Sequence, residues 1–254
     1  MSRSRLTIMA VAIAVAVAIG GFVVYDQILR GDSAAALALP TASPTSATPA
    51  ATAVTGASTA PGSSAVATAA TDSEVAGTWD VAADSVAGYR VREQLASLPA
   101  ESDAVGRTDQ VTGSITIGSD GATTTLTAAS LTVDTTTLAS DESRRDNRLR
   151  NEGLETDRFP TATFTLTQPV DVPAAALAGT PTDITLTGDL TLHGVTKSVE
   201  IPAQAELVDG TIKVAGSITF PLSDYEIVAP NIGGFIVSIA DDGTLEFLVT
   251  FTKG

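Results

Sequence analysis

The sequence predicts an all-β fold, an antiparallel sandwich or closed β-barrel of about eight strands with one short charged helix. Three observations support this prediction. Apolar residues recur at every second position through most of the chain after residue 77. Tight turns marked by Asp-Gly or His-Gly separate these alternating runs. A single stretch, residues 140–152, breaks the pattern because it is dense in charge and has no β-branched residue.

An apolar segment lies near the start of the sequence. Leu6 to Tyr25 carry no charge, and a helix of that length is roughly 30 Å long, which matches the core of a bilayer. Arg3 and Arg5 precede it and favour a cytoplasmic N-terminus. We therefore expect residues 1–31 to be a cytoplasmic tip and a single-pass transmembrane signal-anchor in the cell membrane, with the β domain outside the cytoplasm.

Cleavage of that segment is the alternative. Small residues that suit a signal peptidase occur at Ala34-Ala35-Ala36, about ten residues after the apolar run. A chain cut there would be secreted instead of anchored.

Residues 32–76 are predicted to be a disordered linker. Ala, Thr, Ser and Pro dominate this stretch, and such a composition cannot bury enough apolar surface to offset the entropy lost on ordering. A flexible chain of about 45 residues has an r.m.s. reach of roughly 40 Å. The folded domain is then expected over residues 77–254.

Charge and composition exclude several functions. The net charge of −15 gives a surface that repels phosphate backbones, so nucleic acid is not an expected partner. The chain has no Cys and one histidine, His193, which cannot form a zinc site alone. No phosphate-binding loop or nucleophile motif is recognisable. We therefore expect no metal, no cofactor and no enzymatic activity.

The predicted domain begins with two strands and an acidic loop. A short strand near Trp79 leads to a second over residues 85–95, and a loop with many acidic residues follows to Arg107. The remaining expected elements are a hairpin over 111–133, a helix over 140–152, a strand from Ala162, a helical turn over 174–178, a hairpin over 184–201, a hairpin over 207–220 and a last strand over 245–251.

The hairpin over residues 184–201 carries the clearest signal. Two alternating runs flank His193-Gly194, and Gly supplies the positive φ that such a turn needs. The position of His193 in this turn favours a backbone role over proton transfer.

The charged helix has two interpretations. Ser140 is expected as its N-cap, with ion pairs four residues apart at Asp141–Arg145 and Asp146–Arg150. In the first interpretation the helix is solvated and held by such pairs. In the second, its arginines form an anion site, made of Arg144, Arg145, Arg148 and Arg150.

Three segments of the sequence resemble one known family. They are WDV and DSVAGYRV near Trp79, RRDNRLRNEGLETDRFPTATF from Arg144 to Phe164, and GDLTLHGVTKSV from Gly188 to Val199. Together they resemble the YceI-like family of exported, lipocalin-like proteins that bind polyisoprenoids. The resemblance covers residues 77–254 and implies a lipocalin-like barrel with an elongated apolar cavity for a long isoprenoid chain. The chain departs from the family pattern at Ala83-Asp84-Ser85, where many relatives carry a His.

The resemblance predicts a membrane-tethered, extracytoplasmic module that binds a polyisoprenoid or another long-chain lipid. Two other functions stay open: a structural or adhesive surface domain with a filled barrel, and an accessory protein to quinone or redox chemistry. The oligomeric state is left open. Strand parity selects the residues expected to bind the ligand, which are Tyr89, Val91, Phe164, Leu166, Leu190, Phe220 and Phe247.

Overall fold

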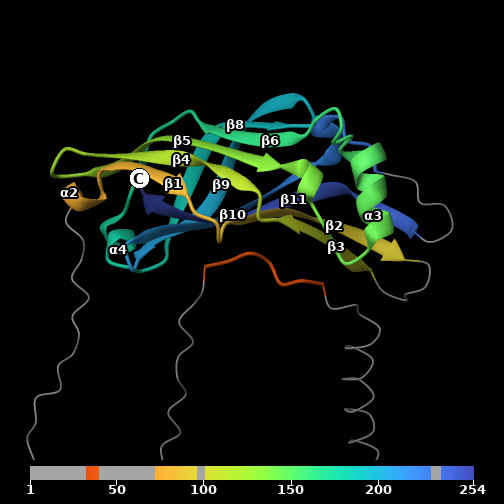
Figure 1. The fold of residues 1–254 in the computed structure, drawn as a ribbon, viewed down its shortest axis with the longest axis horizontal. Helices are drawn as coiled ribbons and strands as arrows, with labels where there is room; N and C mark the ends of the chain where they lie inside the picture. The colour runs from red at the N-terminus through yellow and green to blue at the C-terminus, as the bar shows by residue number, and fades with distance from the viewer. Residues whose placement is uncertain (1–32, 40–71, 96–100, 230–235) are drawn as a thin grey trace, which may run out of the picture.

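Within the described part of the chain, eight antiparallel strands close into a barrel (Figure 1). The structure is a computed structural model that describes residues 33–39, 72–95, 101–229 and 236–254. The predicted barrel of about eight strands is therefore confirmed. In order around the ring the strands are β1 (Gly77–Val81), β4 (Val111–Ser119), β5 (Thr124–Asp134), β6 (Thr161–Leu166), β8 (Thr182–Leu192), β9 (Val195–Val208), β10 (Thr211–Pro221) and β11 (Ile236–Lys253), which returns to β1.

A hairpin extends this ring along β11. β2 (Val86–Leu95) pairs with the N-terminal part of β11, whereas β1 pairs with its C-terminal end, for example at Val81 and Phe251. β3 (Ser102–Thr108) then pairs with β2. The sequence interpretation of this region as a loop was wrong for β3. Its acidic residues and Gly weaken the β signal, and the pairing with β2 overrides it.

The predicted turn at His193-Gly194 is confirmed. It joins β8 to β9, and the φ angles of His193 and Gly194 are 51° and 77°. Positive φ at both central residues is what a two-residue hairpin loop of this kind requires. The side chain of His193 also makes contacts: Nδ1 lies 3.0 Å from the carbonyl oxygen of Tyr225, and Nε2 lies 3.1 Å from a carboxylate oxygen of Glu155.

The charged helix is confirmed as α3 (Ser143–Arg148), and a π-helical turn, η2 (Leu149–Gly153), continues it. The prediction of Ser140 as its N-cap was wrong. Glu142 is the N-cap, and its carboxylate accepts a hydrogen bond from the amide of Arg144 at 3.1 Å. Ser140 instead donates its hydroxyl to Asp146 at 2.6 Å.

One of the two expected ion pairs on this helix forms. Asp141 and Arg145 are 2.6 Å apart. Asp146 is buried, and its carboxylate accepts hydrogen bonds from the hydroxyl and the amide of Ser140. Arg150 donates to the carbonyl oxygen of Leu138 at 3.1 Å. The side chains of Asp146 and Arg150 therefore face other partners, although their spacing permits a pair.

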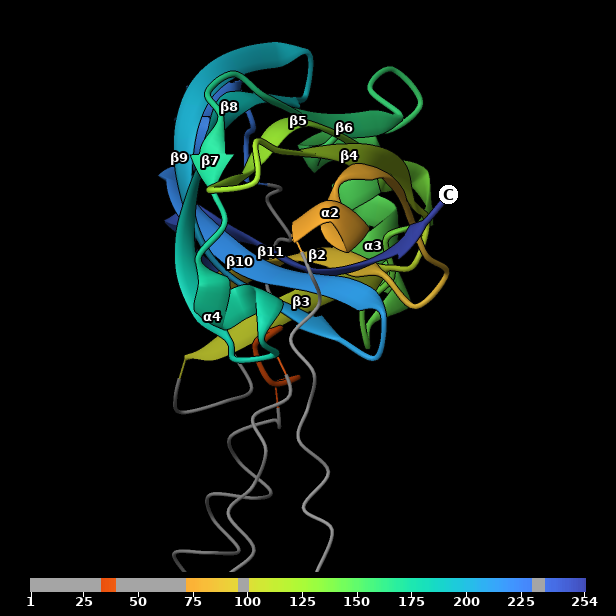
Figure 2. The ribbon, with the colours of Figure 1, turned by 90° about the vertical axis from the view of Figure 1, so that its left-hand side faces the viewer.

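The two ends of the barrel differ. α2 (Asp72–Val75) and α4 (Ala174–Leu177) lie at one end and α3 at the other. Figure 2 looks in from the first end and shows α2 across the opening. There Val75 is 1 % exposed and accepts a hydrogen bond from Trp79 Nε1 at 2.9 Å. Buried apolar side chains fill this end of the barrel, among them Val75, Trp79, Ile115, Ile117, Leu126 and Phe251. The remaining short elements are η1 (Thr135–Thr137), β7 (Val170–Asp171) and η3 (Leu222–Tyr225).

The expected anchor, residues 1–31, lies outside the described residues. Among the residues that are described, no helix has the length and apolar character needed to span a bilayer. Of the expected linker, residues 33–39 and 72–76 are described, and side chains of the barrel bond to backbone atoms in both parts. The three domain limits, 1–31, 32–76 and 77–254, stay predictions.

Two glycines in equivalent turns allow a matched test of the hairpin. Gly194 and Gly210 both have positive φ, 77° and 74°. A Cβ at Gly194 would lie 2.5 Å from the ring of Phe159, whereas one at Gly210 would meet nothing within 4 Å. We expect Gly210→Ala to lower the free energy of unfolding by about 1–2 kcal/mol through backbone strain, and Gly194→Ala to lower it by about 1–3 kcal/mol more through overpacking. Urea unfolding of both variants measures this, and equal losses would contradict it.

Candidate functional site

The barrel is hollow toward α3. The cavity has a volume of about 190 Å³. Strands β2 to β6 and β8 to β11 supply most of its wall, and Leu149, Gly153 and Leu154, from η2 and the residue after it, also line it.

Six of the seven predicted residues lie on the wall of this cavity. They are Tyr89, Val91, Phe164, Leu190, Phe220 and Phe247. Leu166 does not, although it is half-buried and packs against the core at the last position of β6. Strand parity shows which face of a strand points inward, but it gives no position along the barrel axis. That these residues bind a ligand stays a prediction.

Three aromatic rings on the wall lie over glycines of the neighbouring strand. A Cβ added to any of these glycines would lie 2.3–2.7 Å from a ring carbon, so each ring occupies the space that a side chain would fill. The rings therefore lie along the wall, which keeps the lumen open. The pairs are Tyr89 over Gly106, Phe164 over Gly188 and Phe247 over Gly216.

A buried ion pair interrupts the apolar wall. Glu93 on β2 is 3 % exposed, and its carboxylate lies 2.6 Å from Nη2 of Arg145 on α3. Burial disfavours the charge of Arg145, but the hydrogen bonds and charges of Glu93 and Asp141 outweigh it and raise the pKa of the guanidinium above its ordinary value. With two carboxylates on Arg145, this arginine is part of an internal network, and the interpretation of α3 as an anion site has no support here.

Sequence reasoning missed this pair. Glu93 shares the parity of Tyr89 and Val91, so alternation alone could have placed it inside the barrel. Arg145 carried no such signal, because its partner lies 52 residues away. Leu149 and Leu154 were also missed, although apolar residues in and just after a charged helix are candidates for its inner face.

The hydroxyl of Tyr89 lies near this ion pair. It is buried and has no hydrogen-bond partner among the described residues. Burial raises the pKa of Tyr89 to about 12, with Arg145 opposing the shift and the nearby carboxylates adding to it. An unpaired buried hydroxyl is unfavourable by about 1–3 kcal/mol, so it is available to a polar atom of a bound molecule.

Comparison with known proteins gives a family and a fold. The family described as YceI-like domain matches residues 78–251. A UPF0312 protein of Vibrio campbellii is 40 % identical over 73 residues, 28 % of this chain and 35 % of that protein. Protein YceI of Escherichia coli is 37 % identical over 75 residues, 29 % of this chain and 35 % of that protein. These matches span about a third of the relatives' length.

Solved structures share the fold, and one of them is described by its own function. It is a polyisoprenoid-binding domain from Saccharophagus degradans, implicated in plant cell wall breakdown. The match has a TM-score of 0.54 and 20 % identity, and it covers 70 % of this chain and 99 % of that one.

The pKa of Tyr89 leads to a prediction for alkaline stability. Below pH 10 the phenol is neutral in the folded and unfolded chains; above it, the unfolded chain ionises while the folded one stays neutral up to pH about 12. The free energy of unfolding therefore keeps this contribution below pH 10 and falls by about 2–3 kcal/mol as the pH rises from 10 to 12. We expect Tyr89→Phe to remove this part of the loss in urea unfolding at pH 7, 10 and 12. The buried Tyr225, whose pKa burial also raises, keeps its own share. Identical pH slopes for the two proteins would contradict the assignment.

Proposed function

This chain belongs to the YceI-like family, and from that premise we propose that it is a membrane-tethered, extracytoplasmic module that holds a long apolar ligand, a polyisoprenoid or similar lipid, inside its barrel. The observation that carries the proposal is the apolar cavity in the α3 half of the barrel. The polyisoprenoid-binding domain that shares the fold supports the class of ligand.

Burial of apolar surface supplies the affinity. A chain of ten to fifteen carbons gains roughly 8–12 kcal/mol at about 0.8 kcal/mol per buried CH₂, before the loss of its freedom is subtracted. Because no ionic attraction is needed, binding persists in high salt.

The polar part of the wall gives the ligand a direction. Tyr89, Glu93 and Arg145 come together on one part of an otherwise apolar surface. Arg145 is already neutralised by Glu93 and Asp141, so an uncharged oxygen-bearing end suits this place better than a phosphate. The apolar chain then extends along the rings and aliphatic side chains of the remaining wall.

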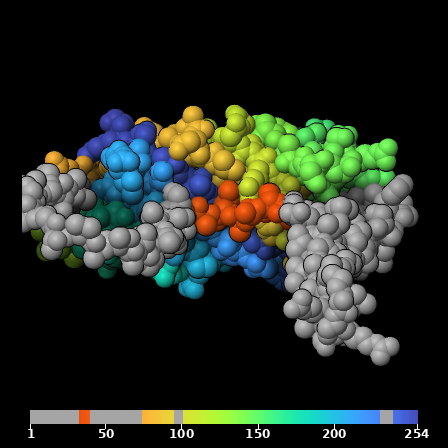
Figure 3. Space-filling view, turned by 90° about the horizontal axis from the view of Figure 1, so that it is seen from below, coloured from red at the N-terminus to blue at the C-terminus, as the bar shows by residue number. Residues whose placement is uncertain are grey.

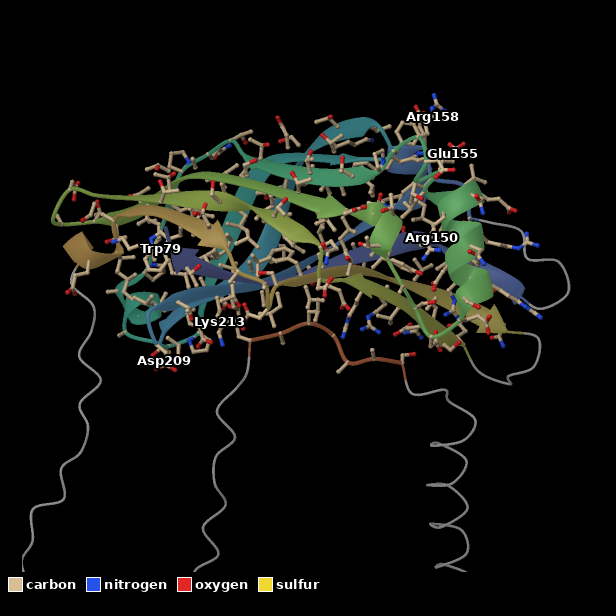
Figure 4. The ribbon with its side chains drawn as sticks, viewed as in Figure 1. Trp79, Arg150, Glu155, Arg158, Asp209 and Lys213 are labelled. Atoms are coloured by element: carbon tan, nitrogen blue, oxygen red, sulfur yellow. The ribbon has the colours of Figure 1, made fainter. Side chains whose placement is uncertain are left out.

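The uneven filling of the barrel favours binding over a structural or adhesive role. A purely structural barrel would be packed along its whole length. Here the end at Val75 and Trp79 is packed, and the half toward α3 is hollow (Figure 4 labels Trp79 and Arg150 toward the two ends). We propose binding in preference to catalysis because apolar side chains make up most of the cavity wall.

Filling the lumen tests the proposed function. We expect Ala162→Leu, which adds apolar atoms at a buried wall position of β6, to reduce or abolish lipid binding while the barrel stays folded. Ala128→Leu makes the same change at an exposed position and should bind normally. The measurement is mass spectrometry of lipid extracted from the purified full-length protein, in low and high salt.

Two results would contradict this proposal. One is a well-folded parent protein that carries no lipid after purification and takes up none when offered isoprenoids. The other is equal binding by Ala162→Leu and the parent, which would place the lipid outside this cavity.

The proposed anchor has its own test. Residues 6–25 are long enough to span the bilayer, so the full-length protein should remain in the membrane fraction through a high-salt wash. Deletion of residues 6–25 should release it. Recovery of a mature chain that begins near Ala36 from the medium would show cleavage instead.

A further inference from the structure

Residues 33–39, here called the strap, lie against the outside of the barrel. Figure 3 shows this segment across the surface. At its start, the hydroxyl of Ser33 donates to the carbonyl oxygen of Asp103 on β3 at 3.0 Å, and the amide of Asp103 approaches the Ser33 hydroxyl oxygen at 3.2 Å. Two arginines hold the next residues, since Arg90 donates to the carbonyl oxygen of Ala34 at 2.7 Å and Arg107 donates to that of Ala35.

A buried carboxylate, that of Glu246, forms ion pairs with both arginines. Glu246 on β11 contacts the same two arginines that bond to the strap outside the barrel, so its carboxylate lies on the outer side, yet its side chain is only 2 % exposed. It lies 2.8 Å from Arg107 and 3.5 Å from Arg90. A guanidinium has five N–H donors, so both arginines can neutralise Glu246 and still bond to the strap.

This surface recognises a backbone. Both arginines bond to main-chain oxygens, which every extended segment offers, and hydrogen bonds from a charged donor are the stronger kind. Side-chain selection comes at the far end of the strap, where Leu39 is buried at 5 % exposure while Leu37 is half-buried.

We propose that the outer wall of β2 and β3 is a docking surface for the strap, and that docking turns the long linker into a short tether. With the strap bound, residues 26–32 alone separate Ser33 from the end of the apolar segment. Seven residues span at most about 25 Å. Without docking, the stretch from residue 26 to α2 has an r.m.s. reach of roughly 40 Å and extends much further. The length of the tether rests on the proposed membrane anchor, whereas the docking does not.

The short tether has a consequence for the cavity. β2, which carries the docking residue Arg90, also carries Tyr89 and Glu93 on its inner face. Docking therefore keeps the polar part of the cavity wall near the bilayer, where a lipid would enter or leave.

The motion of a spin label tests the docking. The chain has no Cys, so Ala36→Cys gives a single labelling site at an exposed strap position. In the full-length protein in detergent we expect slow label motion. Leu39→Ser should make it fast, and Arg107→Ala should do the same from the side of the barrel. Leu39→Ser changes no residue of the barrel, so it separates loss of docking from unfolding.

Matched controls accompany these variants. Leu37→Ser repeats the change of Leu39 two residues earlier, and Arg158→Ala removes an arginine on the opposite side of the barrel, as Figure 4 shows. Both should keep the slow motion. Fast motion in the parent protein, equal to that in urea, or a slow label in Leu39→Ser overturns the docking.

Energy transfer tests the tether. A donor dye on Asp109→Cys, at the exposed turn after β3, and an acceptor on the lipid headgroups of phosphatidylcholine vesicles should show strong transfer in the parent and less in Leu39→Ser. Equal transfer in both proteins overturns the short tether. Lipid extraction reports on the proposed ligand binding, and label motion reports on docking. Because the first measurement does not depend on the strap, failure of one proposal can be distinguished from failure of the other.

Discussion

The pairing of β11 sets the plan of the molecule. β11 is 18 residues long. One of its edges pairs with β10, and the other edge is shared by two strands, β1 and β2. β1 pairs with it near Phe251 and closes the ring, while β2 takes the same edge from residue 248 backward and β3 pairs with β2. Where β1 closes the ring, the interior is packed around Trp79. Where β2 and β3 extend the wall, a bridge from Arg107 to Ala139 and the segment with α3 complete it, and the interior is hollow. The pair of Glu93 and Arg145 fastens α3 to that wall.

The width of the cavity depends on glycines in the strands of its wall. Larger side chains at Gly188 or Gly216 would push the aromatic rings into the lumen and begin to fill it. The sequence places glycine there instead, which keeps Phe164 and Phe247 against the wall.

Local pattern predicted what depends on local pattern. Alternation identified β8, β9 and the end of β11, and Gly194 identified the turn between β8 and β9, because a period of two and a positive φ are visible within a few residues. The depth of Leu166 along the barrel, the partner of Arg145 and the filling of one end by α2 depend on contacts between distant residues, and no local pattern encodes them. The strap was missed for a related reason. Its Ala-rich composition predicts disorder, but it docks through carbonyl oxygens, which all residues share.

The hairpin of β2 and β3 connects the two charged networks of this acidic chain. Glu93 is buried on its inner side and Glu246 on its outer side, and an arginine neutralises each: Arg145 from α3 inside, Arg107 from β3 outside. Stability alone does not explain such pairs, since well-packed apolar residues often stabilise a fold as much as a buried ion pair does. What charged groups add is direction. The inner pair joins β2 to α3 beside the Tyr89 hydroxyl, and the outer pair aims guanidinium donors at the strap. The same two strands thus give the cavity its polar part and the outer wall its docking surface.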